Sequence, residues 1–346
     1  MSWRSSKYIV LCAVELVVMT GLVVVIKERF GPAAPSTEPP VPVRSTVATE
    51  PATHTMLFAG DIMLSRLIGK EITQKKDPLY PFLLIASTTH AADLAFANLE
   101  SPISTRGTKQ GSEYSFRADP ATAAGLTYAG FDVLNMANNH VWDYGRDAAL
   151  DTMALLRDAG ISYIGFGRNY DEANAPVIKQ VGDTKVAFLG YTQFYSPVLW
   201  ADERLGLSSL LPDKIVEEIQ ELKSSGKADL VVISFHWGEE YKTTANEYQR
   251  ELAHQLIDAG ADLIIGHHPH VVQEVEKYDT ADFPGNPAHE GWIAYSLGNF
   301  IFDQNFSPDT RQGLMLRVIM QGSRIVSVEP VKIEFTKTYQ PYVPEE

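Results

Sequence analysis

The sequence has almost no cysteine. Cys12 is the only one among 346 residues, which excludes a disulfide framework and any zinc site built from thiolates. Basic residues are also outnumbered, 29 against 43 acidic ones, and the formal net charge is −14. Because general nucleic-acid binding depends on Lys and Arg, we expect no nucleic-acid partner. A chain this acidic also repels a polyanion unless a cation lies between the two.

Several catalytic signatures are missing as well. There is no Gly-x-Ser-x-Gly elbow of a serine hydrolase, no Walker loop and no dinucleotide-binding fingerprint. A cysteine nucleophile is excluded because Cys12 lies in an apolar N-terminal run. Apolar residues make up 45% and charged residues 21%, which is ordinary for a globular protein and excludes a disordered chain or a polytopic membrane protein.

The N-terminus carries a long apolar run. Residues 8–26 contain a single charge, Glu15, and are close to the roughly 20 residues that a membrane-spanning helix needs. We predict that residues 1–30 form a cytoplasmic head and a single-pass signal anchor in the cell membrane, with the body on the extracytoplasmic side. A cleaved signal peptide is the alternative. Residues 31–53 are rich in Pro, Ser and Thr and read as a linker to a domain over 54–340.

The domain alternates strand-like and helical patterns. Apolar runs typical of buried strands recur at 56–59, 94–97, 133–136, 186–189, 230–235, 263–265 and 292–297. Helical patterns precede Gly160, Gly226 and Gly260, which suit the left-handed cap that ends a helix. Near the C-terminus, residues 313–320 and 324–335 have no helix between them and predict an antiparallel hairpin. The pattern as a whole predicts an α/β fold.

Polar clusters follow the predicted strands. Ligands of open α/β sheets bind at the carboxyl ends of strands, so we expect these clusters to converge on one edge if the strands are mostly parallel. Carboxylates, an amide and several imidazoles suit Mn²⁺, Fe or Zn²⁺ and suit Ca²⁺ poorly. The clusters are Gly60-Asp61, Asn98-Leu99-Glu100, Asn138-Asn139-His140, His236-Trp237-Gly238-Glu239, His267-His268-Pro269-His270 and Gly298-Asn299.

Each of these signals also has a purely structural interpretation. Gly60-Asp61 can be a turn, Asn98 and Asn138 can hydrogen-bond loop backbone, and His236 can be a buried core histidine. The histidine run over 267–270 is harder to explain structurally. Five of the nine histidines lie at such strand ends, which favours a functional site.

Six motifs in this order resemble a known family. They are FAGDIML, FANLESPI, NMANNHVWDYG, SFHWGEEY, IIGHHPHVVQ and YSLGNFIFDQ. The sequence resembles, over about residues 57–304, the CapA-type capsule-synthesis proteins of poly-γ-glutamate assembly, which in turn resemble calcineurin-like metallophosphatases. The resemblance implies a metallophosphatase-like four-layer α-β-β-α sandwich and one or two divalent ions.

The resemblance also assigns roles to individual residues. It implies that His140 is the general acid, that Glu100 replaces a bridging aspartate and that His267 lies outside the metal ligands. If the site is catalytic, we expect metal-assisted hydrolysis or transfer at a phosphoryl or carbonyl centre. The implied metal ligands are Asp61, Glu100, Asn139, His236, His268 and His270.

Two positions depart from the metallophosphatase pattern. Met63 stands where the first motif carries a histidine, so one metal position loses a nitrogen ligand. Val141 stands where the third motif carries an acid, and Asp143 follows two residues later. We therefore expect one strongly bound metal and a second that is weak or absent.

Three further side chains are candidates for substrate binding. Asn299 and Asp303 follow a separate strand and suit substrate contact or support of the metal-binding histidines, and Arg117 suits a carboxylate or phosphate. Three functions are consistent with the sequence: a membrane-anchored component of poly-γ-glutamate or related capsule assembly, a metal-dependent phosphoesterase or γ-glutamyl amide hydrolase, and a non-catalytic polymer-binding module. The first implies an anionic polymer, the membrane and other membrane subunits as partners.

Overall fold

A computed structural model of the chain describes residues 52–195, 197–280 and 289–345. The predicted membrane anchor and all but the end of the predicted linker lie outside these ranges. Within them, no helix combines the length and the apolar character that crossing a bilayer requires.

The first sheet has eight strands within the described residues. They are β1 (Thr53–Ile62), β2 (Leu94–Leu99), β3 (Val133–Asn135), β4 (Ser162–Ile164), β13 (Asn299–Ile301), β14 (Gln312–Gln321), β15 (Arg324–Phe335) and β16 (Pro341–Tyr342). β1 to β4 run parallel in that order, and β13 pairs in parallel with the end of β1. On the other side of β1, β14 pairs antiparallel with β15, which confirms the predicted hairpin.

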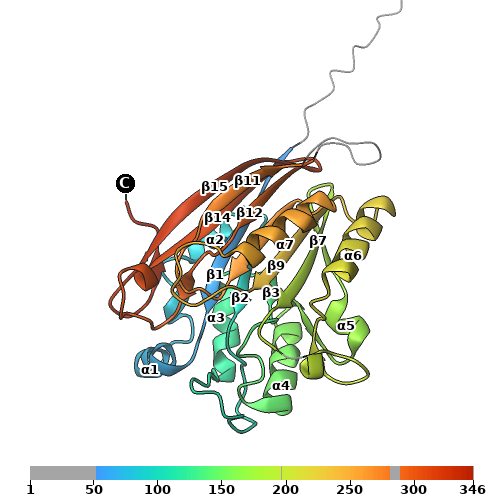
Figure 1. The fold of residues 1–346 in the computed structure, drawn as a ribbon. Coiled ribbons are helices and arrows are strands. Elements are labelled where there is room, and N and C mark those ends of the chain that lie inside the picture. The colour runs from blue at the N-terminus through green and yellow to red at the C-terminus, as the bar shows by residue number, and fades with distance from the viewer. Residues whose placement is uncertain (1–51, 196, 281–288, 346) are drawn as a thin grey trace, which may run out of the picture. The chain divides into compact units, whose positions relative to one another are not determined.

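The second sheet has six strands and is also mixed in direction (Figure 1). In spatial order they are β11 (Val275–Asp279), β12 (Glu290–Ala294), β10 (Leu263–His267), β9 (Leu230–His236), β7 (Thr184–Thr192) and β6 (Val177–Val181). The four central strands are parallel, and the edge strands β6 and β11 are antiparallel to their neighbours. A two-stranded pair, β5 (Phe166–Gly167) with β8 (Gly206–Leu207), stands apart from both sheets.

Local sequence signals mark the ends of several helices. They are α1 (Arg66–Lys75), α2 (Ala86–His90), α3 (Ala123–Tyr128), α4 (Gly145–Asp158), α5 (Tyr170–Asn174), α6 (Pro212–Ser224) and α7 (Glu247–Asp258). Proline at the first position starts α6, and a reciprocal capping box between Asn246 and Gln249 starts α7. Past the end of α4, Gly160 takes the predicted left-handed conformation, with φ of 76°.

Three apolar clusters fill the space between the elements. In β1, Met56 and Phe58 belong to one cluster and Leu57 and Ala59 to another, because alternate side chains of a strand point to opposite faces. The central cluster joins β1, β2 and β14 of the first sheet to β7, β9 and β10 of the second, so the two sheets pack face to face. The outer faces pack against helices, with α6 and α7 covering the second sheet. The predicted α/β class is confirmed.

The packing of the two sheets determines where the polar strand ends meet. The ends of β1 and β10 lie in contact across the sheets, and the His268 backbone N–H donates to Asp61 Oδ2 at 3.2 Å. The polar ends therefore do converge, but they come from edges of two sheets rather than from one.

Candidate metal centre

Seven of the predicted side chains gather at these strand ends. Asp61 is the next-to-last residue of β1, and His236 is the last residue of β9. Glu100 directly follows β2, Asn139 and His140 follow β3, and His268 and His270 follow β10. All are buried except Asn139, which is partly exposed. Burial of so many ionisable groups costs free energy unless they are paired with one another or with a cation.

Glu100 Oε1 is the common point of this cluster. It lies 3.6 Å from His236 Nε2, 3.7 Å from His270 Nε2 and 3.8 Å from His140 Nε2. These distances exceed a hydrogen bond, and Oε1 accepts none from the described residues although it is buried. Gaps of this size are expected between ligands that each bind one ion at about 2.0–2.2 Å. The arrangement therefore fits a divalent metal.

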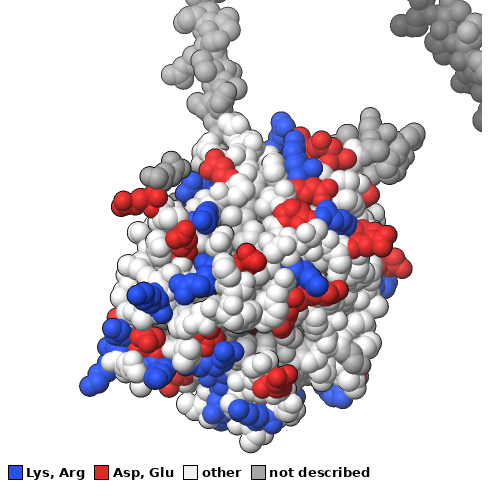
Figure 2. All heavy atoms as spheres, turned by 60° about the vertical axis from the view of Figure 1, so that its left-hand side comes forward, with Lys and Arg blue, Asp and Glu red and all other residues white. Residues whose placement is uncertain are grey.

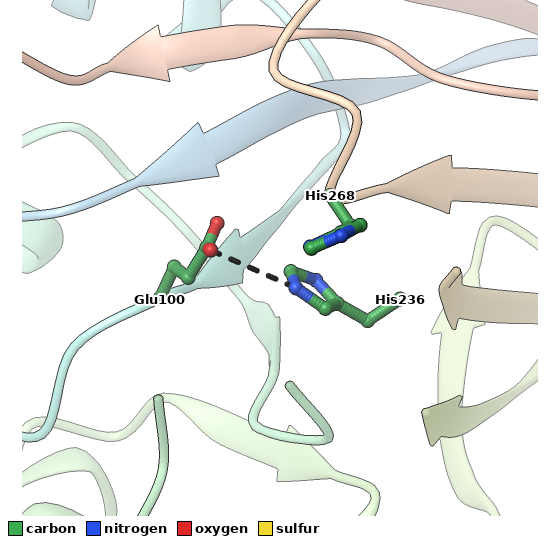
Figure 3. Close-up of side chains that lie close together, drawn as sticks. All are labelled: Glu100, His236 and His268. Carbon is green, nitrogen blue, oxygen red and sulfur yellow. Dashed lines mark ion pairs between the residues drawn. The ribbon is translucent and has the colours of Figure 1, made fainter. Parts of the chain in front are cut away.

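Among the described residues, three groups of His, Asp and Glu side chains have ligand atoms within 4.8 Å of one another. They are Glu100–His236–His268, Asp61–Glu100–His270 and Glu240–His268–His270. Figure 3 shows the first, in which Glu100 and His236 point toward each other and His268 lies beside His236. Glu100 belongs to two groups, which is the geometry that a bridging carboxylate requires. His268 Nδ1 is also buried and without a hydrogen bond to the described residues.

Two predicted amides contact the histidines of the cluster. Asn139 Oδ1 lies 2.9 Å from His236 Nε2, so both atoms face the same point. Asn299 donates through Nδ2 to the carbonyl of Thr310, which leaves its Oδ1 to accept from His270 Nδ1 at 3.0 Å. That bond places the proton of His270 on Nδ1 and leaves Nε2, the atom that faces Glu100, free to bind a metal.

Asn98 contacts candidate metal ligands from both sheets. Its Nδ2 donates to Asp61 Oδ1 at 2.8 Å and lies 3.3 Å from His236 Nδ1, and its Oδ1 accepts from Asn138 Nδ2 at 3.2 Å. This fully buried amide fixes the relative positions of groups from both sheets. His267 lies on the far side of Asp61, with Nδ1 3.2 Å from Asp61 Oδ1.

His140 is oriented by a neighbouring carboxylate. Its Nδ1 lies 2.7 Å from Asp143 Oδ2, which also accepts from the Phe116 backbone N–H at 2.6 Å. The carboxylate keeps the proton on Nδ1 and directs Nε2 toward Glu100. Asp143 thus gives His140 an acidic partner although Val141 occupies the position where the family pattern has one.

The two carboxylates at the centre have opposite pKa shifts. Burial alone raises the pKa of Asp61, but hydrogen bonds and charges from His267 and His270 outweigh it and hold that pKa well below its usual value. Burial raises the pKa of Glu100 well above its usual value, and the negative charge of Asp61 adds to the effect. Without a cation, ionised Glu100 is therefore the costly group of the site, and a metal ion removes that cost.

Two of the histidines, His236 and His268, are held neutral. Burial first, and the charge of His270 second, lower the pKa of His268 from 6.5 to about 3. Burial and His268 likewise hold the pKa of His236 well below its usual value. Neutral imidazole is the form that binds metals, so these shifts prepare both side chains as ligands.

A pH dependence of stability follows for the metal-free protein. Because the folded-state pKa of His268 is depressed, the unfolded chain binds more protons below pH 6.5, and stability falls as the pH drops through that value. Going from pH 7 to pH 5 should cost about 2 kcal/mol from this group. Thermal unfolding of the chelated full chain and of His268→Gln measures it. The variant should have a shallower slope, and equal slopes would contradict the assignment.

Two predicted substrate-binding residues bind neighbouring segments of the chain through their polar groups. Asp303 is buried and binds α1, since its Oδ2 accepts from the Leu67 backbone N–H at 3.0 Å and pairs with Arg66 Nε at 3.2 Å. Arg117 donates through Nη1 to the carbonyls of Arg106 and Gly107 and stacks over Tyr144 at 4.1 Å. The structure therefore gives the guanidinium of Arg117 a role in holding its loop.

Other residues of the site escaped sequence reasoning. Glu240 belongs to the motif SFHWGEEY but was not distinguished from its neighbour Glu239. Phe194 packs on His268 with ring centroids 3.9 Å apart, and Tyr195 OH donates to the Asn139 carbonyl at 2.6 Å. These two side chains follow β7, whose end carries no metal-ligand type that would have given a signal.

The backbone at the histidine run is unusual. His268 and His270 have φ of 96° and 58°, a left-handed conformation that is unfavourable for residues other than glycine. Such conformations persist where the surrounding structure enforces them, and they concentrate at functional sites. Here the conformation turns both imidazoles of the run toward Glu100 and Asp61.

Comparison with known proteins finds a family and relatives whose names refer to capsule or PGA synthesis. The sequence model of the family described as "Bacterial capsule synthesis protein PGA_cap" matches residues 55–304. The "Capsule biosynthesis protein CapA" of Bacillus anthracis is 34% identical over 307 residues, covering 84% of this chain and 72% of that protein. The "PGA biosynthesis protein CapA" of Bacillus subtilis is 32% identical over 282 residues, covering 80% and 70%.

Among solved structures, the NAD nucleotidase of Haemophilus influenzae superposes with a TM-score of 0.49 at 12% identity. The match covers 86% of this chain and 54% of that protein.

Proposed function

This chain belongs to the PGA_cap family of bacterial capsule synthesis proteins, and we propose that it is a metal-binding component in the assembly of poly-γ-glutamate or a related anionic polymer. The names of its relatives, which refer to capsule and PGA biosynthesis, support the polymer. The acidity of the chain makes a bound cation a requirement for handling a polyanion.

The position of Glu100 carries the proposal. Its Oε1 is buried, accepts no hydrogen bond from the described residues and faces three imidazole nitrogens at 3.6–3.8 Å. Two candidate metal groups share this one carboxylate. Asn98 donates to Glu100 Oε2 at 3.4 Å, but Oε1 has no donor among the described residues, and a buried carboxylate oxygen without a donor destabilises the fold unless a cation binds it.

The chemistry of the site follows from its donors. A divalent ion such as Mn²⁺, Fe²⁺ or Zn²⁺, when bound, supplies positive charge that attracts and polarises a phosphoryl or carbonyl oxygen. Asn139, His236 and His270, the last oriented by Asn299, would hold the ion. His140, whose Nδ1 proton is held by Asp143, directs Nε2 into the site, and a proton taken up on Nε2 is the one that would pass to a leaving group.

The cellular position belongs to the proposal as well. We place the chain in the cell membrane through one helix over residues 8–26, with the linker and the body on the extracytoplasmic side. This position suits contact with an emerging polymer and with other membrane subunits of a synthesis complex. The apolar run of residues 8–26, with its single charge, supports it.

The orientation of His140 favours a second candidate function. A histidine paired with a buried aspartate and directed at a metal group is the geometry of a general acid, and a non-catalytic polymer-binding module has no use for it. The alternative is a metal-dependent hydrolase acting on a phosphoester or a γ-glutamyl amide.

Metal analysis and polymer binding test the proposal. We expect the purified full chain to contain one or two equivalents of Mn, Fe or Zn and to retain poly-γ-glutamate, and His140→Ala to keep both properties. A chain that binds none of these metals contradicts the metal centre, and one that retains no polymer contradicts the assembly role. If the wild type cleaves a phosphoester or a γ-glutamyl amide and His140→Ala is slower by about 10²–10⁴-fold, the hydrolase replaces our first assignment.

A further inference from the structure

Arg66 is an arginine held in place by a buried carboxylate. It is the first residue of α1, and its φ of 52° lies in the left-handed region. Its Nε pairs with Asp303 Oδ2 at 3.2 Å, and the Asp303 side chain is completely buried. The Leu67 backbone N–H donates to the same oxygen, so Asp303 fixes both the start of the helix and the direction of the arginine.

The guanidinium of Arg66 lies at the rim of the metal centre. It sits over the ring of Phe116 at 5.5 Å, and that ring is 4.0 Å from the imidazole of His140. Phe302, adjacent to Asp303 in sequence, packs on His270 with ring centroids 4.6 Å apart. One layer of aromatic side chains thus separates Arg66 from residues on both sides of Glu100.

The terminal nitrogens of Arg66 are available to a ligand. Nε pairs with Asp303, Nη1 and Nη2 make no hydrogen bond with the described residues, and the side chain is 39% exposed. Nη1 and Nη2 together present the two-pronged edge that binds a carboxylate or phosphate. Arg117 differs, because its Nη1 already donates to two backbone carbonyls.

We propose that Arg66 binds a carboxylate of the anionic polymer beside the metal centre. This inference rests on the proposed function. Each unit of a γ-linked glutamate chain carries one free carboxylate, so a chain with one unit at the metal centre presents further carboxylates to the rim. Asp303 holds the guanidinium in position, and Phe116 and Tyr114 support its face.

The distribution of charged side chains favours binding of a polyanion on the side of the metal centre where α1 begins. Without a bound ion, the metal centre and its edge repel a polyanion through the carboxylates of Asp61, Glu100, Asp143 and Glu240. α1 carries lysines as well as Arg66. In the lower part of Figure 2, at the level where Figure 1 places α1, lysine and arginine side chains gather on the surface. A polyanion therefore meets favourable charge on the α1 side of the site.

Calorimetric titration of the Mn²⁺-loaded full chain with a γ-glutamyl decamer tests the proposal. Arg66→Gln should bind at least about tenfold more weakly, because a charge-assisted hydrogen bond is lost. The control is Arg204→Gln, which removes an exposed arginine whose side-chain bonds all go to Asp202 and should change affinity less than twofold. Arg66→Lys keeps a positive partner for Asp303 but lacks the two guanidinium nitrogens that bind a carboxylate together. It should bind the decamer several-fold more weakly than wild type and contain the same amount of manganese.

The outcomes separate the inference from the function on which it rests. If wild type binds no decamer, the polymer assignment fails, and Arg66 has no role in it. If wild type binds and both Arg66 variants bind equally well, Arg66 alone is wrongly assigned. If Arg204→Gln loses as much affinity for the decamer as Arg66→Gln, the polymer is attracted by the general charge of the surface and not by a specific site at Arg66. A competition experiment tests the kind of anion that Arg66 binds. If inorganic phosphate displaces the decamer from wild type at a lower concentration than free glutamate does, and does not displace it from Arg66→Gln, Arg66 binds a phosphate rather than a carboxylate.

Discussion

Replacing Glu100 with glutamine is expected to abolish metal binding while stabilising the metal-free protein. The carboxylate belongs to two of the candidate metal groups, so its loss removes a ligand from both. We expect an affinity at least about 100-fold weaker, since even changes in residues that only support metal ligands cost 10–100-fold. In the metal-free state, burial and the charge of Asp61 raise the pKa of Glu100, so the neutral amide removes an electrostatic cost and should stabilise the fold.

Thermal unfolding with and without metal measures both effects. Metal at about 1,000 times its dissociation constant should stabilise the wild type by about 4 kcal/mol, which corresponds to roughly 8–16 °C in Tm for a domain of this size. Glu100→Gln should start from a higher Tm in chelator and gain at most about a third of the wild-type shift at the same metal concentration. Glu203→Gln, an exposed carboxylate, is the control and should gain as much as wild type. A Glu100→Gln protein that gains the full shift would exclude the proposed centre.

Local sequence signals were sufficient for much of the fold. The strand runs, the hairpin of β14 and β15 and the left-handed glycines after α4, α6 and α7 all appear where the residues predict them. These features are encoded by neighbours in the chain, through apolar periodicity and through glycine's tolerance of positive φ. For the same reason, each polar strand end could be recognised one at a time.

The relations between the strand ends could not be obtained in this way. Asp61 and His268 are 207 residues apart and meet because two sheets pack face to face, which no local pattern encodes. Asn98 looked like a loop residue, yet it bonds to groups of both sheets. Likewise Arg117 had the chemistry for an anion site, but the backbone carbonyls around it were not visible in the sequence, and Arg66 had no signal beyond its charge.

Gly60→Ala is expected to be among the most damaging single-methyl changes in the protein. A Cβ at this position would lie 2.0 Å from the carbonyl oxygen of Gly298, which also accepts from the Asp61 backbone N–H at 3.0 Å. Neither atom can move freely, because β1 and β13 pair there, with Asp61 opposite Asn299. We expect a loss of at least about 3 kcal/mol, or roughly 6–12 °C in Tm.

The same change should weaken the metal centre, because the two strands that it pushes apart carry Asp61 and Asn299, which both contact Nδ1 of His270. Gly69→Ala is the control, since its Cβ would meet only the Leu64 carbonyl oxygen at 3.5 Å and alanine favours the helix. It should leave metal affinity unchanged and raise Tm slightly. Gly60 therefore serves the site by letting two backbones approach closely, and a Gly60→Ala chain with wild-type Tm and metal affinity would show that this contact does not position Asp61.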